Sequence, residues 1–330
     1  MPILVTEGAG YIGSHVVKYL QDFGEDIIVV DNLKTGYKES IDVEHFYRTD
    51  IRDSDEVIRI IKKHKIDSVI HFAASSLVGE SMYKPYEYYN NNVYGTLCLL
   101  EAMNVTGVNK IVFSSTAAVY GDPEGTPIVE DSITEPTNPY GETKLAMEKM
   151  MKWFESAYGI NYVSLRYFNA AGADKDGNIG EDHVPETHLI PLVLQVPLGK
   201  RDKIDIYGDD YDTADGTCIR DYIHVLDLAQ AHYKALQWLR ENSSSEIFNL
   251  GNGNGYSVNE VIRTARKVTG HPIPAVVAQR RPGDPAILVA SSKKAQDILG
   301  WKPQYDSLKT IIEDAWNWHR SNRDGFGRKI

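Results

Sequence analysis

Cysteine, positive charge and long apolar runs are all scarce in this chain of 330 residues. Its two cysteines, Cys98 and Cys218, show no CxxC spacing, which argues against a disulfide framework and against a cysteine-based zinc site. The 46 acidic residues outnumber the 35 Lys and Arg, and the resulting formal charge of −11 opposes binding to nucleic acid phosphates. No apolar run reaches the roughly 18 residues that a membrane-spanning helix requires. We therefore expect a cytoplasmic protein that binds a small molecule and neither nucleic acid nor a membrane.

The first half of the chain has a regular alternation of strand-like and helix-like segments. The strand-like runs, rich in β-branched residues, are Pro2–Thr6, Asp26–Asp31, Val43–Tyr47, Asp67–Phe72, Lys110–Ser115 and Asn161–Tyr167. The helix-like stretches between them are Tyr11–Phe23, Asp53–Lys65, Pro85–Asn104 and Tyr140–Tyr158. This alternation predicts an α/β fold with a doubly wound parallel sheet of the Rossmann type.

The alternation weakens after Tyr167, which predicts a smaller, mixed α/β C-terminal domain. Separate elements are expected near Ser257–Thr269 and Leu308–His319, and the last stretch, Arg320–Ile330, looks like a loosely held tail. We expect residues 1–168 plus about 216–245 to form the Rossmann-type domain, and residues 169–215 plus about 246–330 to form the smaller, substrate domain.

A glycine-rich turn follows the first expected strand. Residues 6–13 read TEGAGYIG and run into a helix, where free backbone N–H groups and the positive end of the helix dipole suit a pyrophosphate. The second strand ends at Asp31, at the distance where an acidic side chain accepts hydrogen bonds from the adenosine ribose. Asp31 would also repel a 2′-phosphate. The combination indicates a dinucleotide site that prefers NAD to NADP.

A second motif, YGETK, begins at Tyr140 and ends at Lys144. Spacing of four places both side chains on one helix face. A lysine ammonium, together with a nicotinamide cation, would lower the tyrosine pKa from about 10 towards neutrality and make it a general base. Thr116, at the end of the fifth expected strand, lies at the sheet edge where α/β folds bind ligands, and can bridge a substrate oxygen and Tyr140. A tyrosine and lysine at this spacing also occur by chance at an exposed helix start.

These motifs resemble those of the extended short-chain dehydrogenase/reductases over nearly the whole chain. The matching stretches are GAGYIGSH at 8–15, DNL at 31–33, HFAA at 71–74, VGES at 78–81, YGETK at 140–144, LRYFNAAGA at 165–173 and DGTCIRDYIHVLDLA at 215–229. The last stretch is similar to the UDP-hexose 4-epimerase branch in particular. The resemblance implies an NAD-dependent isomerase that interconverts UDP-galactose and UDP-glucose through a transient 4-keto sugar, and that acts as a homodimer.

Carried over residue by residue, the resemblance implies a cofactor site, a substrate site and a catalytic group. The cofactor contacts are Gly8, Gly10, Tyr11, Ile12, Gly13, Asp31, Asn32, Leu33, Thr35, Gly36, Asp50, Ile51, Phe72, Ala73, Ala74, Asn91, Ser114, Tyr140, Lys144, Tyr167 and Phe168. The UDP-sugar contacts are Thr116, Asn169, His188, Leu189, Ile206, Tyr207, Arg220, Arg281, Asp284 and Leu288. Tyr140, Lys144 and Thr116 are the implied catalytic residues.

Glu7 departs from the family pattern, which has glycine at this position. A carboxylate beside the phosphates costs Coulomb energy unless the side chain turns outward to water, and it must accept a backbone conformation that glycine adopts more easily. We therefore expect NAD to bind more weakly or to be lost more easily, but still to bind.

Several other functions remain open at this point. Relatives that eliminate water or carboxylate carry an extra acid near Thr116, whereas here the next residues are Ala117 and Ala118, which offer no proton donor. A UDP-uronate 4-epimerase and a non-catalytic protein that binds NAD or UDP-sugars are further alternatives, the latter supported only by Glu7. The run Glu181, Asp182, His183, Glu186 and His188 could be drawn as a metal site, but a solvated or substrate-covering loop is preferred, and no metal is expected. Leu288, intermediate in size beside the sugar's C2 substituent, predicts some turnover of UDP-N-acetylhexosamines.

Overall fold

The alternating first half of the chain builds one sheet, flanked by helices. The structure is a computed structural model that describes residues 1–123, 125–281 and 284–327. In this part of the chain seven strands pair in the order β11-β6-β5-β4-β1-β2-β3, and every pair is parallel. The strands are β1 (Pro2–Thr6), β2 (Asp26–Asp31), β3 (His45–Arg48), β4 (Ser68–His71), β5 (Lys110–Thr116), β6 (Asn161–Tyr167) and β11 (Glu246–Leu250). The predicted doubly wound α/β fold is confirmed.

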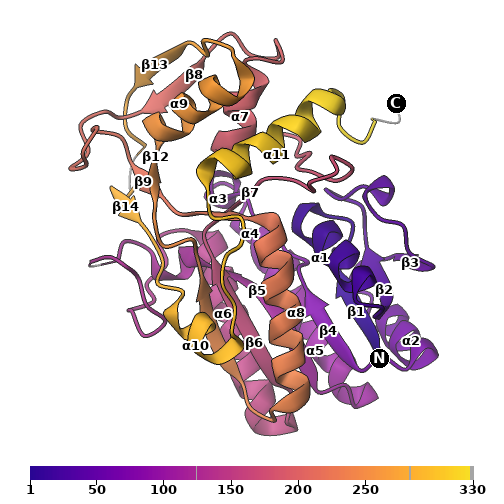
Figure 1. Ribbon diagram of the computed structural model, residues 1–330. Coiled ribbons are helices and arrows are strands. Elements are labelled where there is room, and N and C mark those ends of the chain that lie inside the picture. Colours follow the sequence, from indigo (N-terminus) through magenta and orange to yellow (C-terminus); the bar gives the residue numbers. More distant parts are fainter. Residues whose placement is uncertain (124, 282–283, 328–330) are drawn as a thin grey trace.

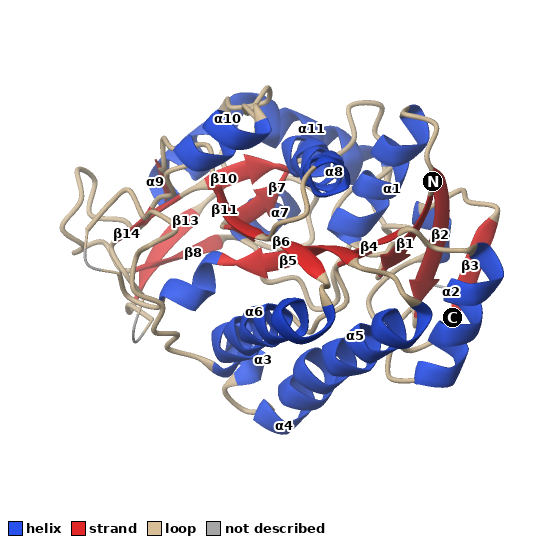
Figure 2. Cartoon of the chain, turned by 90° about the horizontal axis from the view of Figure 1, so that it is seen from below, coloured by secondary structure: helices blue, strands red, loops and turns tan. Residues whose placement is uncertain are grey.

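Helices cover both faces of this sheet, as Figure 2 shows. One face carries α1 (Tyr11–Asp22) and α8 (Val225–Glu241), and the other carries α2 (Ser54–His64), α5 (Gly95–Thr106) and α6 (Pro139–Tyr158). A buried cluster fills each interface, one around Val29 and Leu228 and one around Ile28 and Met147. Because the central strands are buried on both faces, they read as continuous apolar runs without alternation, which is why the sequence located them well.

The C-terminal part adds smaller sheets above the carboxyl ends of the large sheet's strands (Figure 1). The strands are β7 (Asn169–Ala171) with β10 (Tyr222–His224), β8 (Ile204–Tyr207) with β13 (Ala275–Ala278), and β9 (Ile219–Arg220) between β12 (Tyr256–Ser257) and β14 (Ile287–Leu288). The helices are α7 (Leu189–Gln195), α9 (Val258–Thr269), α10 (Lys293–Leu299) and α11 (Leu308–Ser321). Ser257 and Glu260 form a capping box that starts α9.

Most predicted helix ends are right to within a residue, but one long helix is wrong. Asp53 caps α2 with its side chain and Lys65 ends it in a left-handed conformation, so both lie just outside the helix they were assigned to. The stretch Pro85–Asn104 is instead α4 (Pro85–Tyr88), a π-helical segment η2 (Tyr89–Tyr94) and then α5. Short helices α3 (Val78–Ser81), η1 (Lys38–Ser40) and η3 (Ala117–Tyr120) complete the fold.

Two further expectations differ from the structure. The sheet's outer strand β11 pairs with β6, although it falls in the range expected for the substrate domain; its apolar residues complete the large sheet's core. The expected loose tail is held in place up to residue 327: Arg323 donates to the Leu198 carbonyl at 2.8 Å, and the Phe326 ring stacks near Trp318. Residues 328–330 lie outside the described part. Among the described residues, no helix combines the length and apolar character needed to cross a membrane.

Candidate active site

The glycine-rich turn joins β1 to α1 with the helix drawn close against the strand. The backbone N–H of Glu7 donates to the Val30 carbonyl at 2.8 Å, and the Glu7 carbonyl accepts from Gly10 at 3.1 Å. A Cβ on Gly13 would lie 2.2 Å from the Glu7 carbonyl oxygen, so only glycine allows this close approach. The N-terminus of α1 therefore opens towards the cleft, as a pyrophosphate cradle requires.

Asp31 ends β2 beside this turn and is 3% exposed. Its carboxylate accepts from the Ala9 N–H at 3.0 Å and from the Leu33 N–H at 2.7 Å. Burial raises the pKa of Asp31, against the lowering effect of these two hydrogen bonds. Each carboxylate oxygen still has acceptor capacity for a ribose hydroxyl.

Asp50 lines the same cleft as Asp31. It accepts a hydrogen bond from the Asn32 side chain at 3.1 Å, and its ion pair with Arg52 spans 2.7 Å. The Arg52 side chain holds the pKa of Asp50 down to about 2. The Asn32 amide is thereby oriented at the place where the resemblance puts the adenosine half of the cofactor.

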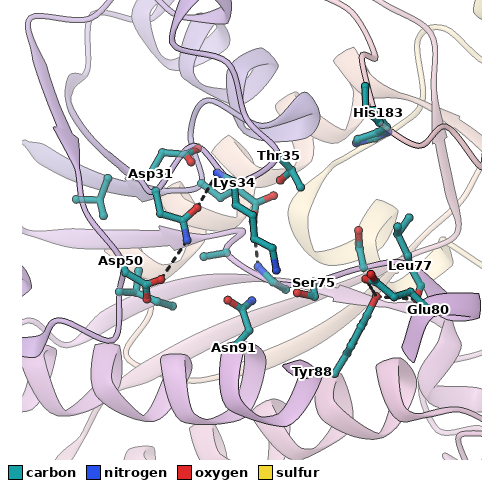
Figure 3. Close-up of a pocket in the computed structure, with 18 of the residues that line it drawn as sticks. Asp31, Lys34, Thr35, Asp50, Ser75, Leu77, Glu80, Tyr88, Asn91 and His183 are labelled. Carbon is teal, nitrogen blue, oxygen red and sulfur yellow. Dashed lines mark hydrogen bonds between the residues drawn. The ribbon is translucent and has the colours of Figure 1, made fainter. Parts of the chain in front are cut away.

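The cleft, together with the open solvent at its mouth, spans about 900 Å³. Eight residues of the implied cofactor site line it, namely Asp31, Asn32, Thr35, Asp50, Ile51, Ala73, Ala74 and Asn91. In Figure 3, Asp31 and Asp50 lie on one side of the cleft, and Asn91 and Tyr88 project from the helices below it. His183 approaches from a loop on the opposite side. Gly10, Tyr11 and Thr35 line a smaller hollow beside the turn.

The π-helical turn η2 explains how Asn91 reaches this cleft. Its neighbour Asn92 is fully buried, accepts from the Ser75 N–H at 2.7 Å and donates to the Thr143 hydroxyl at 3.0 Å. The wider turn therefore directs one asparagine into the cleft and uses the next to fix the loop after β4 against α6. Single π-turns of this kind are frequent at functional sites.

The implied catalytic residues meet where β5 ends and α6 begins. Asn138 caps α6 by accepting from the Gly141 N–H at 2.9 Å, which sets the first turn with Tyr140 in it. Tyr140 is hydrogen-bonded to the Thr116 side chain. Lys144, one turn further and 3% exposed, donates to the Ser114 carbonyl at 2.8 Å.

Burial dominates the acidity of Tyr140 and Lys144 in the protein alone. Burial raises the pKa of Tyr140 to about 12, with the Thr116 hydrogen bond opposing the rise and the negative charge of Glu7 adding to it. Burial lowers the pKa of Lys144 to about 8, although Glu7 and Glu148 oppose that fall. In the protein alone, enclosure keeps the pKa of Tyr140 high; the expected lowering by a lysine charge together with a nicotinamide cation stays a prediction for the occupied site.

A buried ion pair fixes α6 in place. Glu148 accepts from Arg166 on β6 at 3.0 and 2.6 Å, and from the Ser115 hydroxyl at 2.5 Å. Both charged side chains are about 5% exposed or less. The helix that carries Tyr140 and Lys144 is thus tied to the two strands on which Thr116 and Tyr167 lie.

Glu7 does not turn outward to water. Its backbone φ is +55°, the left-handed region that glycine adopts more easily, and its side chain lines the cleft. One carboxylate oxygen accepts from the Ala74 N–H at 3.0 Å. Burial raises the pKa of Glu7 to about 8, and the nearby Asp31 carboxylate adds to the rise.

Glu181, His183, Glu186 and His188 do converge, with one ligand atom from each lying within 4.8 Å of the others. The Glu181 carboxylate lies 3.0 Å from His183 Nδ1 and 2.7 Å from His188 Nδ1. Burial opposes a charge on His188, but Glu181 and Glu186 outweigh it and raise its pKa to about 11. In this structure each of the two histidines therefore lies against a carboxylate.

The implied UDP-sugar residues gather in two places. Arg220 pairs with Asp284 at 2.5 Å and lies opposite Leu288 where β9 pairs with β14, while the Arg281 guanidinium lies 4.1 Å from the centre of the Tyr207 ring. Asn169 donates to the Asp221 carbonyl at 3.0 Å. Leu288 packs with Phe168 and Ala117 against the cluster around Val119, next to Thr116. His188 lies elsewhere, in the histidine cluster, with Leu189 starting α7 beside it.

Several residues that line the cleft were not predicted from the sequence: Lys34, Ser75, Ser76, Leu77, Glu80, Tyr88, Val184 and Pro185. Glu80 belongs to the matching stretch VGES, and the Tyr88 hydroxyl bonds to it at 3.1 Å. The VGES stretch was the sequence signal from which Glu80 could have been predicted. The others reach the cleft through loop shape, for which the sequence has no periodic pattern.

Comparison with known proteins agrees with these motifs. A family model described as the NAD dependent epimerase/dehydratase family matches residues 3–251. Curated UDP-glucose 4-epimerases from Halalkalibacterium halodurans and Lacticaseibacillus casei are 61% and 56% identical, each over 99% of this chain and over 98% and 99% of their own lengths.

Solved structures show the same likeness. A crystal structure of a UDP-glucose 4-epimerase matches with a TM-score of 0.98 at 56% identity, over 99% of this chain and 100% of its own. The Brucella ovis enzyme in complex with NAD matches at 0.94 and 46% identity, over 96% and 97%. The Bifidobacterium longum enzyme with NAD⁺ and UDP matches at 0.93 and 41%, over 98% and 100%.

Proposed function

Because the chain belongs to the NAD-dependent epimerase/dehydratase family, we propose that its cleft epimerises UDP-glucose and UDP-galactose at C4, with NAD as cofactor. The family follows from the match to residues 3–251 and from the full-length relatives. The observation that carries the reaction is the meeting of Tyr140, its partner Thr116 and the buried Lys144 beside the glycine-rich cradle.

The residues present fit NAD with one exception. The close turn at Gly13, the acceptor Asp31 and the oriented Asn32 suit the pyrophosphate and the adenosine ribose, whereas the inward carboxyl of Glu7 does not suit phosphates. Ala73, Ala74, Asn91, Ser114, Tyr167 and Phe168 would hold the remaining length of the cofactor. When bound, NAD supplies the reversible oxidation and reduction of C4.

Tyr140 holds and moves the proton of the sugar's 4-hydroxyl. Thr116 orients both oxygens, and the lysine charge stabilises the phenolate form. Since enclosure alone puts the pKa of Tyr140 at about 12, its activation needs further positive charge in the occupied site. The same phenolic oxygen returns the proton once the ketone has turned over, so the protein ends each cycle unchanged.

The C-terminal part is proposed to hold the UDP-sugar. Guanidinium groups suit diphosphates, and Arg220 and Arg281 both lie in the group of Tyr207, Asp284 and Leu288 described above. Asn169 and His188, on the connecting segments, are proposed as further substrate contacts, although His188 lies apart from this group in the histidine cluster. In this division residues 1–168 and about 216–245 bind NAD, and residues 169–215 and about 246–330 bind the UDP-sugar, although β11 in the last range pairs with the large sheet.

A homodimer is part of this proposal. Six large apolar side chains are exposed on η2, α5 and α6, namely Tyr89, Tyr94, Leu97, Val105, Trp153 and Tyr158, with exposed fractions of 46%, 50%, 41%, 50%, 71% and 55%. We call them the α5–α6 face. The two helices lie side by side on one side of the sheet (Figure 2), and such patches are typical of interfaces.

The test is to follow UDP-galactose by NMR with purified protein, first without and then with added NAD. Appearance of UDP-glucose in either case supports the function, and a Tyr140→Phe variant that loses about 10²–10⁴-fold in rate would tie it to this site. No conversion in either case would contradict it.

A further inference from the structure

Glu7 lies inside the cofactor cleft by virtue of its backbone. The turn is fixed at both ends, because its N–H bonds to Val30 and its carbonyl bonds to Gly10, and because that carbonyl packs against Gly13. With φ fixed at +55°, the side chain leaves the turn into the cleft, where it lines the wall together with Asp31 and Ala74.

The carboxyl has little to balance a negative charge there. One N–H, that of Ala74, donates to it, and among the described residues no ion pair includes Glu7. Lys144 and Tyr140 face it from α6, Asp31 from β2, His183 from the loop before α7 and Tyr167 from β6. The opposing charges of Asp31 and Lys144 partly cancel, so enclosure dominates.

A dinucleotide brings two phosphate charges to this turn. It also displaces the water that still reaches the carboxyl, which disfavours the ionised form further. The backbone N–H and carbonyl of Glu7 are both bonded, so its Cβ stays at the cleft wall, and the Ala74 N–H holds the carboxyl there.

On this geometry, which rests on the proposed use of NAD, we propose that Glu7 makes cofactor binding proton-linked: the cradle takes up NAD together with one proton, held by the Glu7 carboxyl. The apparent affinity then depends on the fraction of protein in which the carboxyl is already protonated. NAD itself has no group that titrates between pH 7 and pH 9 in this scheme, so the proton comes from solvent.

The expected change in the apparent Kd for NAD follows from the pKa of the Glu7 carboxyl. With the pKa of Glu7 at about 8, most carboxyls are protonated at pH 7 and few at pH 9. The apparent Kd for NAD should rise about tenfold over that interval. Binding should also take up close to one proton at pH 9.

The experiment measures NAD binding, without substrate, to full-length wild type, Glu7→Gln and Glu7→Gly at pH 7 and pH 9. Glutamine keeps the shape of the Glu7 side chain without its charge, and glycine removes the strain of the positive φ. The two variants fold independently, so the test still works if one of them does not fold. The ratio of the wild-type Kd to the Glu7→Gln Kd should rise about tenfold with pH. An unchanged ratio would overturn the inference.

Lys144 titrates near pH 8 in the same cleft, so a signal specific to a carboxyl is also needed. Difference infrared spectra on adding NAD at pH 9 should show the carbonyl band of a neutral carboxylic acid in wild type and not in Glu7→Gln. If wild type binds NAD but the band is absent, the proton-linked role of Glu7 is overturned, while NAD as the cofactor is not. Failure of Glu7→Gly to bind NAD at either pH would instead overturn the proposed cofactor.

Discussion

At the scale of single residues, Glu7 should also make the free energy of unfolding depend on pH. In the folded protein the Glu7 carboxyl keeps its proton up to about pH 8, whereas in the unfolded chain it loses the proton near the ordinary glutamate pKa of 4.5. Between these values the unfolded state binds fewer protons, so stability falls as pH rises, by up to about 1.4 kcal/mol per pH unit. Glu7→Gln lacks this loss. We predict equal unfolding free energies at pH 4 and a variant that is more stable by a few kcal/mol at pH 8.

Urea unfolding of both proteins without NAD measures this difference. All other titrating groups are common to the two, so only the difference between the curves matters. Parallel stability curves from pH 4 to pH 8 would show that the Glu7 carboxyl ionises in the folded protein as it does in water.

Leu288 carries a second prediction for a single residue. Like Phe168 and Ala117, it packs against the buried cluster around Val119, which follows Thr116 in the chain, and the sugar ring must lie near Thr116 if Tyr140 is the base. Replacing Leu288 by tyrosine should lower turnover of UDP-N-acetylglucosamine at least tenfold relative to UDP-glucose, since one bulky group in a pocket is worth about 1–3 kcal/mol. Initial rates on the two sugars measure this, and an unchanged ratio would mean that Leu288 does not border the C2 substituent.

Residues that act through a local pattern could be found from the sequence, and residues that act through enclosure could not. Asp31 ends a strand at a fixed distance from a glycine-rich turn, and Lys144 follows Tyr140 by one helical turn. Spacing alone determines both. The inward course of Glu7 depends on hydrogen bonds to Val30 and Gly10, and the high pKa of Tyr140 depends on burial; neither has a sequence signal.

At the scale of elements, the ion pair between Glu148 and Arg166 should be necessary for the position of α6. Its two partners are buried and form several bonds, so removal of one leaves an uncompensated charge. We predict that Glu148→Ala lowers the free energy of unfolding by about 3–5 kcal/mol and lowers kcat, because α6 carries Tyr140 and Lys144.

Urea denaturation at pH 7 measures the loss. Lys293→Ala is the matched control, because Lys293 pairs with Asp297 on α10 with both side chains well exposed, and such pairs contribute less than about 1 kcal/mol. Similar losses in both variants would contradict the proposed importance of the buried pair.

Strands and helices with a clear pattern of apolar residues were predicted from the sequence. The helix interrupted by the π-turn η2 was not. The sheet strands and α6 follow from apolar runs and from the cap at Asn138. The π-turn η2 within Pro85–Asn104 has helix-compatible residues throughout, and its extra residue is stabilised by the contacts of Asn92 with Ser75 and Thr143. Those contacts join segments far apart in the chain, which a local pattern does not report.

At the scale of the whole molecule, the sequence predicted a doubly wound sheet with a smaller second part, because order and composition decide the layers. The sequence did not predict that β11 joins the large sheet or that the C-terminal tail is held in place. Both depend on pairing between distant segments, as between Glu246 and Val163 for β11 and between Arg323 and Leu198 for the tail.

The α5–α6 face leads to the last prediction. An apolar surface that spans two parallel neighbouring helices can meet its own copy about a two-fold axis, and the four helices then bury it on both sides. We predict that the 37.0 kDa chain behaves as a dimer in light scattering and that Leu97→Glu or Trp153→Glu converts it to a monomer. A charge in the centre of such an interface is buried without a partner and costs several kcal/mol. Ile298→Glu, at a side chain exposed to 43% on α10, is the control and should remain dimeric. A wild type that is monomeric at micromolar concentration, or variants that stay dimeric while the control dissociates, would place the contact elsewhere.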